Sequence, residues 1–116
     1  MSKMNLTASV RKANSTACIV DINGEINAQA ENTLMEAYNQ ASLNGIRSII
    51  LNFSRLEYMN SSGIGLLVTL LIRVKRQNQR LLAFGLSEHY RQIFELTRLN
   101  EAIGLYSSEM DALSAV

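Results

Sequence analysis

Two adjacent hydroxyls, Ser61 and Ser62, stand where an apolar strand pattern gives way to an apolar helix pattern. Residues 59–65 read Met-Asn-Ser-Ser-Gly-Ile-Gly, between a strand pattern over 48–53 and a helical pattern over about 62–77. The first turn of a helix presents unpaired N–H groups and a partial positive charge, and both suit an anion. A hydroxyl placed there can cap the helix, attack an electrophile or receive a phosphate group.

Attack on an electrophile requires a base and a positioned serine. His89 is the only histidine, and nothing in its spacing links it to a serine. Ser62, His89 and Asp111 have the residue types of a catalytic triad, but the sequence gives no sign that they come together. The chain also lacks the glycine that a tight nucleophile elbow has two places before its serine. We expect a solvent-facing His89 and no catalytic residue.

Cofactor and metal signals are weak as well. The run Gly63-Ile64-Gly65 reaches Val68 where a dinucleotide loop needs a third glycine, and no lysine follows it as in a phosphate loop. One histidine, one cysteine and scattered carboxylates do not compose a metal site. We therefore expect neither a cofactor nor a metal ion.

Capping and phosphorylation are the remaining alternatives for the hydroxyls. Asn60, Ser61 and Ser62 are all good N-cap residues, and one cap contributes only about 1 kcal/mol, so one of the three is surplus to capping. A phosphate at a helix N-terminus gains about 0.3–2 kcal/mol, so the fold should survive it. The same phosphate brings a charge of about −2 into any docked interface. A penalty of about 2.8 kcal/mol would weaken that interface a hundredfold, which is what a reversible switch needs.

The periodicities predict an α/β fold in one domain over residues 1–116, with a mixed sheet of four to five strands and three to four helices. The first two strands should form a hairpin, and residues 46–53, 62–77 and 81–84 should form a right-handed strand–helix–strand unit. Residues 54–61 are expected to form a loop. The expected strands are 5–11, 16–22, 46–53, 80–85 and 103–106, and the expected helices are 28–43, 62–77, 87–99 and 109–115.

The helix over 62–77 carries more apolar side chains than one face needs. Its expected core stripe is Ile64, Leu67, Leu71 and Val74, widened by Val68. Leu66 and Leu70 then lie on a second face, which either a neighbouring helix or a binding partner covers. In the helix over 87–99 the expected apolar positions are Tyr90, Ile93, Phe94 and Leu96.

The charges give no bulk argument for nucleic acid or membrane. Eleven basic and ten acidic side chains leave a net charge near +1. Arg73, Lys75, Arg76 and Arg80 read as a solvated helix end that complements the helix dipole, without the interleaved aromatics of a nucleic-acid binder.

Cysteine content and hydropathy bear on whether the protein is secreted, embedded in a membrane or cytoplasmic. Cys18 is the only cysteine and lies in an apolar run, so we expect a buried structural thiol. The start of the chain lacks the apolar stretch of a secretory signal, and the longest apolar run, 64–72, is too short to span a bilayer. We expect a soluble, cytoplasmic protein without membrane insertion.

Three segments resemble a known family, the STAS domains, and within it the small bacterial anti-sigma-factor antagonists. Residues 24–27 look like the family's Gly-Glu-Leu-Asp, residues 51–54 resemble its Leu-Asp-Leu-Ser, and residues 59–65 are similar to its Met-Asp-Ser-Ser-Gly-Leu-Gly. The last of these is the most specific, and the resemblance covers nearly the whole chain.

The resemblance implies a non-catalytic switch. The unmodified protein would bind an anti-sigma factor that is itself a serine kinase of the histidine-kinase-like ATPase type. Phosphorylation would release it, and a metal-dependent serine phosphatase would reset it. Ser62 is the first choice of acceptor and Ser61 the second. The implied partner-binding residues are Asn27, Asn60, Ser61, Ser62, Gly63 and Leu66.

The sequence departs from the family at three aspartates, which read as Asn27, Asn52 and Asn60. These amides can cap and hydrogen-bond but carry no charge, so phosphorylation could be slower without an orienting carboxylate or easier without its repulsion. The alternative function is a constitutive STAS interaction module, for example a soluble subunit of a lipid or anion transport system.

Overall fold

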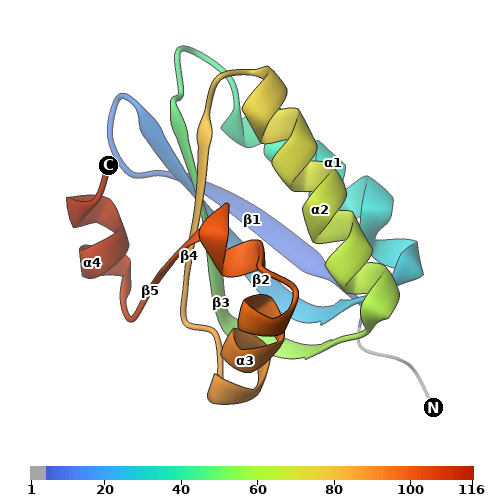
Figure 1. Ribbon diagram of the computed structural model, residues 1–116. Coiled ribbons are helices and arrows are strands. Elements are labelled where there is room, and N and C mark those ends of the chain that lie inside the picture. Colours follow the sequence, from blue (N-terminus) through green and yellow to red (C-terminus); the bar gives the residue numbers. More distant parts are fainter. Residues whose placement is uncertain (1–4) are drawn as a thin grey trace.

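The structure is a computed structural model that describes residues 5–116 (Figure 1). Five strands form one sheet in the order β1-β2-β3-β4-β5, in which β1 runs antiparallel to β2 and every other pair is parallel. This confirms the α/β class, the mixed sheet and the N-terminal hairpin. The strands are β1 (Thr7–Lys12), β2 (Ala17–Ile26), β3 (Ser48–Met59), β4 (Arg80–Phe84) and β5 (Gly104–Tyr106).

Helices cover the two faces of the sheet unequally. α1, α2 and α3 pack on one face, whereas α4 alone packs on the other (Figure 1). α2 connects β3 to its parallel neighbour β4, as expected. The helices are α1 (Glu31–Ala41), α2 (Ser61–Arg76), α3 (Glu88–Leu96) and α4 (Glu109–Ser114), with 3₁₀ turns η1 (Ala28–Ala30) and η2 (Leu99–Glu101).

Alternation along the strands creates two cores. In β3, Ile49, Leu51 and Phe53 join the larger core beneath α1, α2 and α3. Ile50 points to the other face and joins a small core closed by Ala112 of α4. Cys18 is buried in the larger core, as expected, and burial raises the pKa of its thiol.

The expected loop over 54–61 is wrong, because β3 continues to Met59. β2 is also longer than expected and continues to Ile26. The two extensions pair with each other through two irregularities of register, next to Asn23 and Glu25. The polar residues that suggested a loop lie where the sheet faces solvent, so strand pairing tolerates them.

The expected core stripe of α2 is partly wrong. Leu70 is 1% exposed and belongs to the core, whereas Val68 is 39% exposed. The buried stripe of α2 is therefore Gly63, Leu67, Leu70 and Val74. The stripe is rotated because α2 packs against α1 as well as the sheet; at this helix pair the Tyr38 hydroxyl oxygen lies 3.5 Å from the carbonyl oxygen of Arg73. Leu70 is therefore part of the protein's own core and is not available to a partner.

α3 ends earlier than expected, at Leu96, whose side chain is 85% exposed rather than in the core. Arg98 adopts a left-handed conformation with φ 62°, which reverses the chain, and Leu99 is buried in place of Leu96. The helical periodicity of the sequence continues across this turn, which no glycine marks.

Candidate functional site

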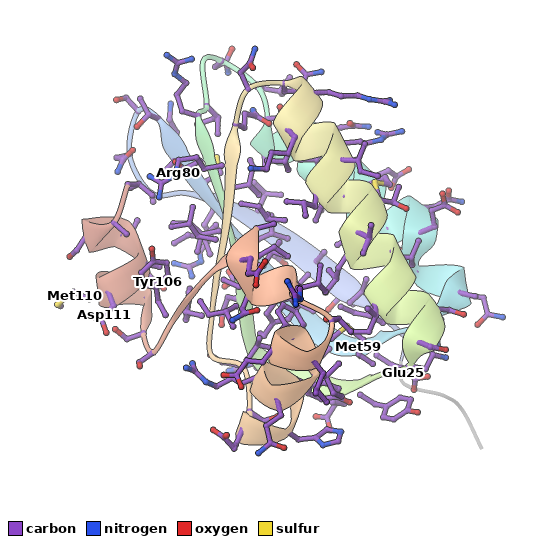
Figure 2. All side chains as sticks on the ribbon, viewed as in Figure 1. Glu25, Met59, Arg80, Tyr106, Met110 and Asp111 are labelled. Carbon is purple, nitrogen blue, oxygen red and sulfur yellow. The ribbon has the colours of Figure 1, made fainter. Side chains whose placement is uncertain are left out.

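The ends of two parallel strands bring the predicted residues together. Ile26 and Met59 are paired at the ends of β2 and β3, and the Asn60 N–H donates to the carbonyl of Ile26 at 3.3 Å. Asn27 and Asn60 follow directly, so they lie at the same edge of the sheet, where α2 begins. Figure 2 shows the labelled Glu25 and Met59 near the first turn of α2.

Asn60 is the residue that caps α2. Its backbone is extended, and its Oδ1 accepts a hydrogen bond from the Gly63 N–H at 2.9 Å. Ser61 and Ser62 are the first two residues of the helix, and both are exposed. An asparagine thus supplies the cap that any of the three residues could have supplied. Both serine hydroxyls are left at the surface without a capping task.

Gly63 fixes the position of the serines. It is buried, and a Cβ built on it would stand 2.2 Å from the Ile26 carbonyl oxygen and 2.8 Å from Met59 Cγ. The first turn of α2 can therefore rest directly on the end of β2 only because residue 63 has no side chain. Leu66 lies four residues after Ser62, on the same side of the helix, and is half-buried. We refer to the candidate partner-binding residues Asn27, Asn60, Ser61, Ser62 and Leu66, which Gly63 positions, as the docking surface.

Both the oxygen and the nitrogen of the Asn27 side-chain amide form hydrogen bonds. Its Oδ1 accepts from the Gln29 N–H at 2.9 Å and caps η1, while its Nδ2 donates to Glu25 Oε2 at 2.9 Å. An aspartate could make the first contact but would repel the carboxylate of Glu25. This geometry gives a physical reason for asparagine at position 27. A hollow of about 240 Å³ lies beside the pair and extends to Thr33 of α1.

Two residues near the site were assigned wrongly or incompletely from the sequence. The hydroxyl of buried Tyr90 accepts a hydrogen bond from the Met59 N–H at 2.8 Å and so holds the end of β3. Tyr90 was predicted only as an apolar position, because its partner is 31 residues away. Tyr58, which is 52% exposed, was placed in the expected loop. The alternation of Leu56 with Tyr58 could have indicated the longer strand.

The third asparagine has a different environment. Asn52 lies on the sheet face that carries α4, where its Nδ2 donates to Asp21 Oδ1 at 2.7 Å and its Oδ1 accepts from the Ser54 N–H at 3.0 Å. Asp21 also accepts hydrogen bonds from Arg11, which, together with the contact to Asn52, lowers the pKa of its carboxyl group. Asn52 is therefore separate from the docking surface.

The structure does not bring Ser62, His89 and Asp111 together as a catalytic triad. Asp111 lies on α4, on the sheet face opposite α2, and Figure 2 shows it across the molecule from Met59. His89 is exposed as expected, and its ring packs edge-on against Tyr90 at 4.9 Å. Within residues 5–116, no group of three or more histidine, cysteine or carboxylate side chains is arranged to hold a metal ion.

Four carboxylates lie on elements that end or begin at the same end of the sheet as the docking surface. Glu25 and Glu57 lie near the ends of β2 and β3, and Glu31 and Glu88 lie in the first turns of α1 and α3. First-turn carboxylates complement the positive ends of their helix dipoles. Arg55 of β3 and Arg91 of α3 lie on the same elements, so this end of the molecule carries charges of both signs beside its neutral hydroxyls and amides.

The chain belongs to the STAS domain family, whose pattern matches residues 8–112. Among curated proteins it is similar to the anti-sigma-B factor antagonist of Staphylococcus aureus, with 29% identity over 82 residues that cover 71% of this chain and 76% of the relative. It is also similar to the anti-sigma-B factor antagonist of Listeria monocytogenes, with 24% identity over 106 residues that cover 91% and 93%.

Solved structures share the fold. The crystal structure of an anti-sigma factor antagonist from Mycobacterium paratuberculosis matches with a TM-score of 0.81 and 21% identity, covering 97% of this chain and 94% of the other. The anti-sigma factor antagonist SpoIIAA in its unphosphorylated form matches with a TM-score of 0.69 and 21% identity, covering 94% and 95%. None of the helices in residues 5–116 has the length and apolar character needed to cross a bilayer.

Proposed function

We propose that this protein is an anti-sigma-factor antagonist that works as a phospho-switchable binding protein. In the unmodified state it binds, through the docking surface, an anti-sigma factor that is a serine kinase of the histidine-kinase-like ATPase type. Phosphorylation of Ser62, or of Ser61 as the second choice, releases it, and a metal-dependent serine phosphatase restores binding. The role is non-catalytic, and we expect it in the cytoplasm, beside the transcription machinery.

One observation carries the proposal: Asn60 caps α2, so Ser61 and Ser62 stand exposed in the first helical turn with no structural task. A phosphate on either serine would meet the positive end of the helix dipole, so the fold tolerates it. The names of the relatives support the role, as does SpoIIAA, a structural neighbour known in unphosphorylated and phosphorylated forms.

Ser62 is favoured over Ser61 by its neighbours. It shares a side of α2 with Leu66, so a partner that covers this leucine would also cover the Ser62 hydroxyl. A charge of about −2 at that point would have to be desolvated inside the interface.

The test begins with the chain, the candidate kinase and ATP. We expect one phosphate on Ser62, located by mass spectrometry of the peptide, and no label in a Ser61→Ala, Ser62→Ala variant. Ser62→Asp should weaken kinase binding, measured by calorimetry, by about a hundredfold or more, which corresponds to about 2.8 kcal/mol.

The matched control is Ser107→Asp, which adds the same charge at an exposed position between β5 and α4. It should bind the kinase as the wild type does. The switch is refuted if neither serine is labelled and Ser62→Asp keeps full affinity.

A constitutive STAS interaction module, for example a subunit of a lipid or anion transport system, is the second candidate. The observation that favours it is Asn60, which has no charge where the family has aspartate. Capture from cells separates the two functions. A small ATP-binding kinase as main partner supports the switch, and a transport ATPase supports the constitutive module.

A further inference from the structure

Six cationic side chains gather at the end of the molecule opposite the serines. The parallel strands β2, β3 and β4 all begin at this end, β1 ends here, and α2 runs toward it from Ser61. In Figure 2 the labelled Arg80 lies at the opposite end of the sheet from Glu25 and Met59. We define the basic end as Lys12, Arg47, Arg73, Lys75, Arg76 and Arg80, all exposed.

Hydrogen bonds hold the three turns of this end together, and the Arg47 N–H donates to the carbonyl of Thr16, in the turn between β1 and β2, at 2.7 Å. Buried Gln79 donates through Nε2 to Ser42 Oγ and to the Ile46 carbonyl, both at 2.9 Å, and its Oε1 accepts from the Tyr38 hydroxyl at 2.7 Å. The Arg80 N–H donates to the Arg47 carbonyl at 2.8 Å. The cations are therefore carried by one connected framework rather than by independent loops.

Carboxylates do not neutralise these cations. The ion pairs within residues 5–116 involve Arg11 and Arg98, and neither belongs to the basic end. The negative end of the α2 dipole accounts for Arg73, Lys75 and Arg76 in the last turn. It does not account for Lys12, Arg47 or Arg80, which are carried by strands or their flanks.

Apolar side chains project among the cations. Leu43, in the turn between α1 and β3, is 60% exposed and lines a hollow of about 230 Å³ together with Lys12. Ile72, one turn before Arg76 on α2, is 48% exposed. The aromatic ring of this region, Tyr38, is buried, so the end offers no platform on which bases could stack.

We propose that the basic end adsorbs to the surface of an anionic phospholipid bilayer. The cations would neutralise lipid headgroups, and Leu43 would enter the headgroup layer as a shallow apolar anchor. Cations combined with a projecting leucine fit a bilayer surface better than an acidic protein or a nucleic acid, since neither of those requires an exposed leucine. The docking surface would face away from the bilayer and stay free for a partner. This inference goes beyond the proposed function.

Vesicle flotation tests the proposal with the full chain. We expect binding to vesicles of phosphatidylcholine mixed with phosphatidylglycerol, none to phosphatidylcholine alone, and weakening as salt rises. One basic side chain near an anionic leaflet strengthens binding about fivefold, so the double variant Arg73→Gln, Arg76→Gln should bind about twenty- to thirtyfold more weakly. Leu43→Ser should weaken binding by a further factor of several.

The matched control is Arg55→Gln, Arg98→Gln, which loses the same charge from exposed positions outside the basic end and should bind vesicles as the wild type does. Three results would overturn the proposal: no binding to the mixed vesicles at low salt, an equal loss in the control, or tighter binding to duplex DNA than to the vesicles at the same salt. Kinase affinity of Arg73→Gln, Arg76→Gln is a separate readout, which keeps this proposal distinguishable from the proposed function.

Discussion

Gly63 in the first turn of α2 lies so close to Ile26 at the end of β2 that a Cβ on residue 63 would stand 2.2 Å from the Ile26 carbonyl oxygen. That oxygen also accepts the Asn60 N–H, so it cannot move without losing a hydrogen bond. The contact sets the height of the two serines above the sheet. The glycine of the Asn-Ser-Ser-Gly motif is thus a packing requirement as well as part of a recognition sequence.

Gly63→Ala should destabilise the fold. The added methyl meets backbone, which cannot rotate away, and overpacking of this kind costs about 1–3 kcal/mol. Gly65→Ala is the matched control, because a Cβ on residue 65 would have no neighbour within 4 Å and alanine favours the helix by roughly 0.5–1 kcal/mol. Urea unfolding of both variants measures the difference. Equal stability of the two would show that the contact does not constrain the helix.

Asn60→Ala should lower the free energy of unfolding by about 1 kcal/mol, because the Gly63 N–H loses its cap. Asn60→Asp should retain the cap and gain roughly 0.3–1 kcal/mol from the helix dipole. Thermal and urea unfolding test both changes. If Asn60→Ala is as stable as the wild type, one of the serines has taken over the cap. Its hydroxyl would then have a structural role, which contradicts the assignment of Asn60 as the cap.

Asn27→Asp should be destabilising by on the order of 1 kcal/mol, because the hydrogen bond to Glu25 becomes a repulsion. Either asparagine or aspartate at position 27 can accept the hydrogen bond from the Gln29 N–H, so the cap of η1 is retained. Placing the same change in a Glu25→Gln background should remove most of the loss, since a neutral amide can donate to the new carboxylate. A double-mutant cycle measures the coupling free energy between positions 25 and 27. A coupling near zero would refute the stabilising hydrogen bond between Asn27 and Glu25.

Stability should fall in acid partly through Asp21. Hydrogen bonds from Arg11 and Asn52 hold the folded-state pKa of this carboxyl below its ordinary value of 3.8. A depressed folded-state pKa gives stability that is complete above the unfolded-state pKa and is lost as pH falls through the folded-state value.

Asp21→Asn should therefore flatten the decline of stability below about pH 4, and Arg11→Gln should flatten it too by returning the Asp21 pKa toward 3.8. Urea midpoints measured across acidic pH test the slope, and NMR titration of the Asp21 carboxyl carbon tests the pKa itself. An unchanged slope in both variants would contradict the assignment.

Local signals in the sequence predicted the architecture correctly. Strict alternation marked β1, and a continuous apolar run marked the buried part of β3. The helical period with Ser87 at its start marked α3 to within a few residues. These patterns depend on neighbours within one turn or two residues, so a single sequence contains them in full.

The candidate site was predicted in its composition but not in its internal roles. The adjacent serines at a strand-to-helix junction were visible, whereas the choice of Asn60 as the cap was not. The contact of Gly63 with Ile26 and the hydrogen bond of Tyr90 to Met59 were also hidden, because each joins residues more than 30 positions apart. The same separation hid the extension of β3, which depends on pairing with the end of β2.

The sequence alone thus determined the fold class, the order of the elements and the adjacent hydroxyl pair at a strand-to-helix junction, since periodicity and residue type decide these. Only the tertiary structure decided how charge is distributed. A net charge near +1 gave no bulk argument for any class of partner. Parallel strands place Glu25 and Glu57 toward the end of the sheet where the serines lie and Arg47 and Arg80 at the other end, because all parallel strands begin at one end of the sheet and finish at the other.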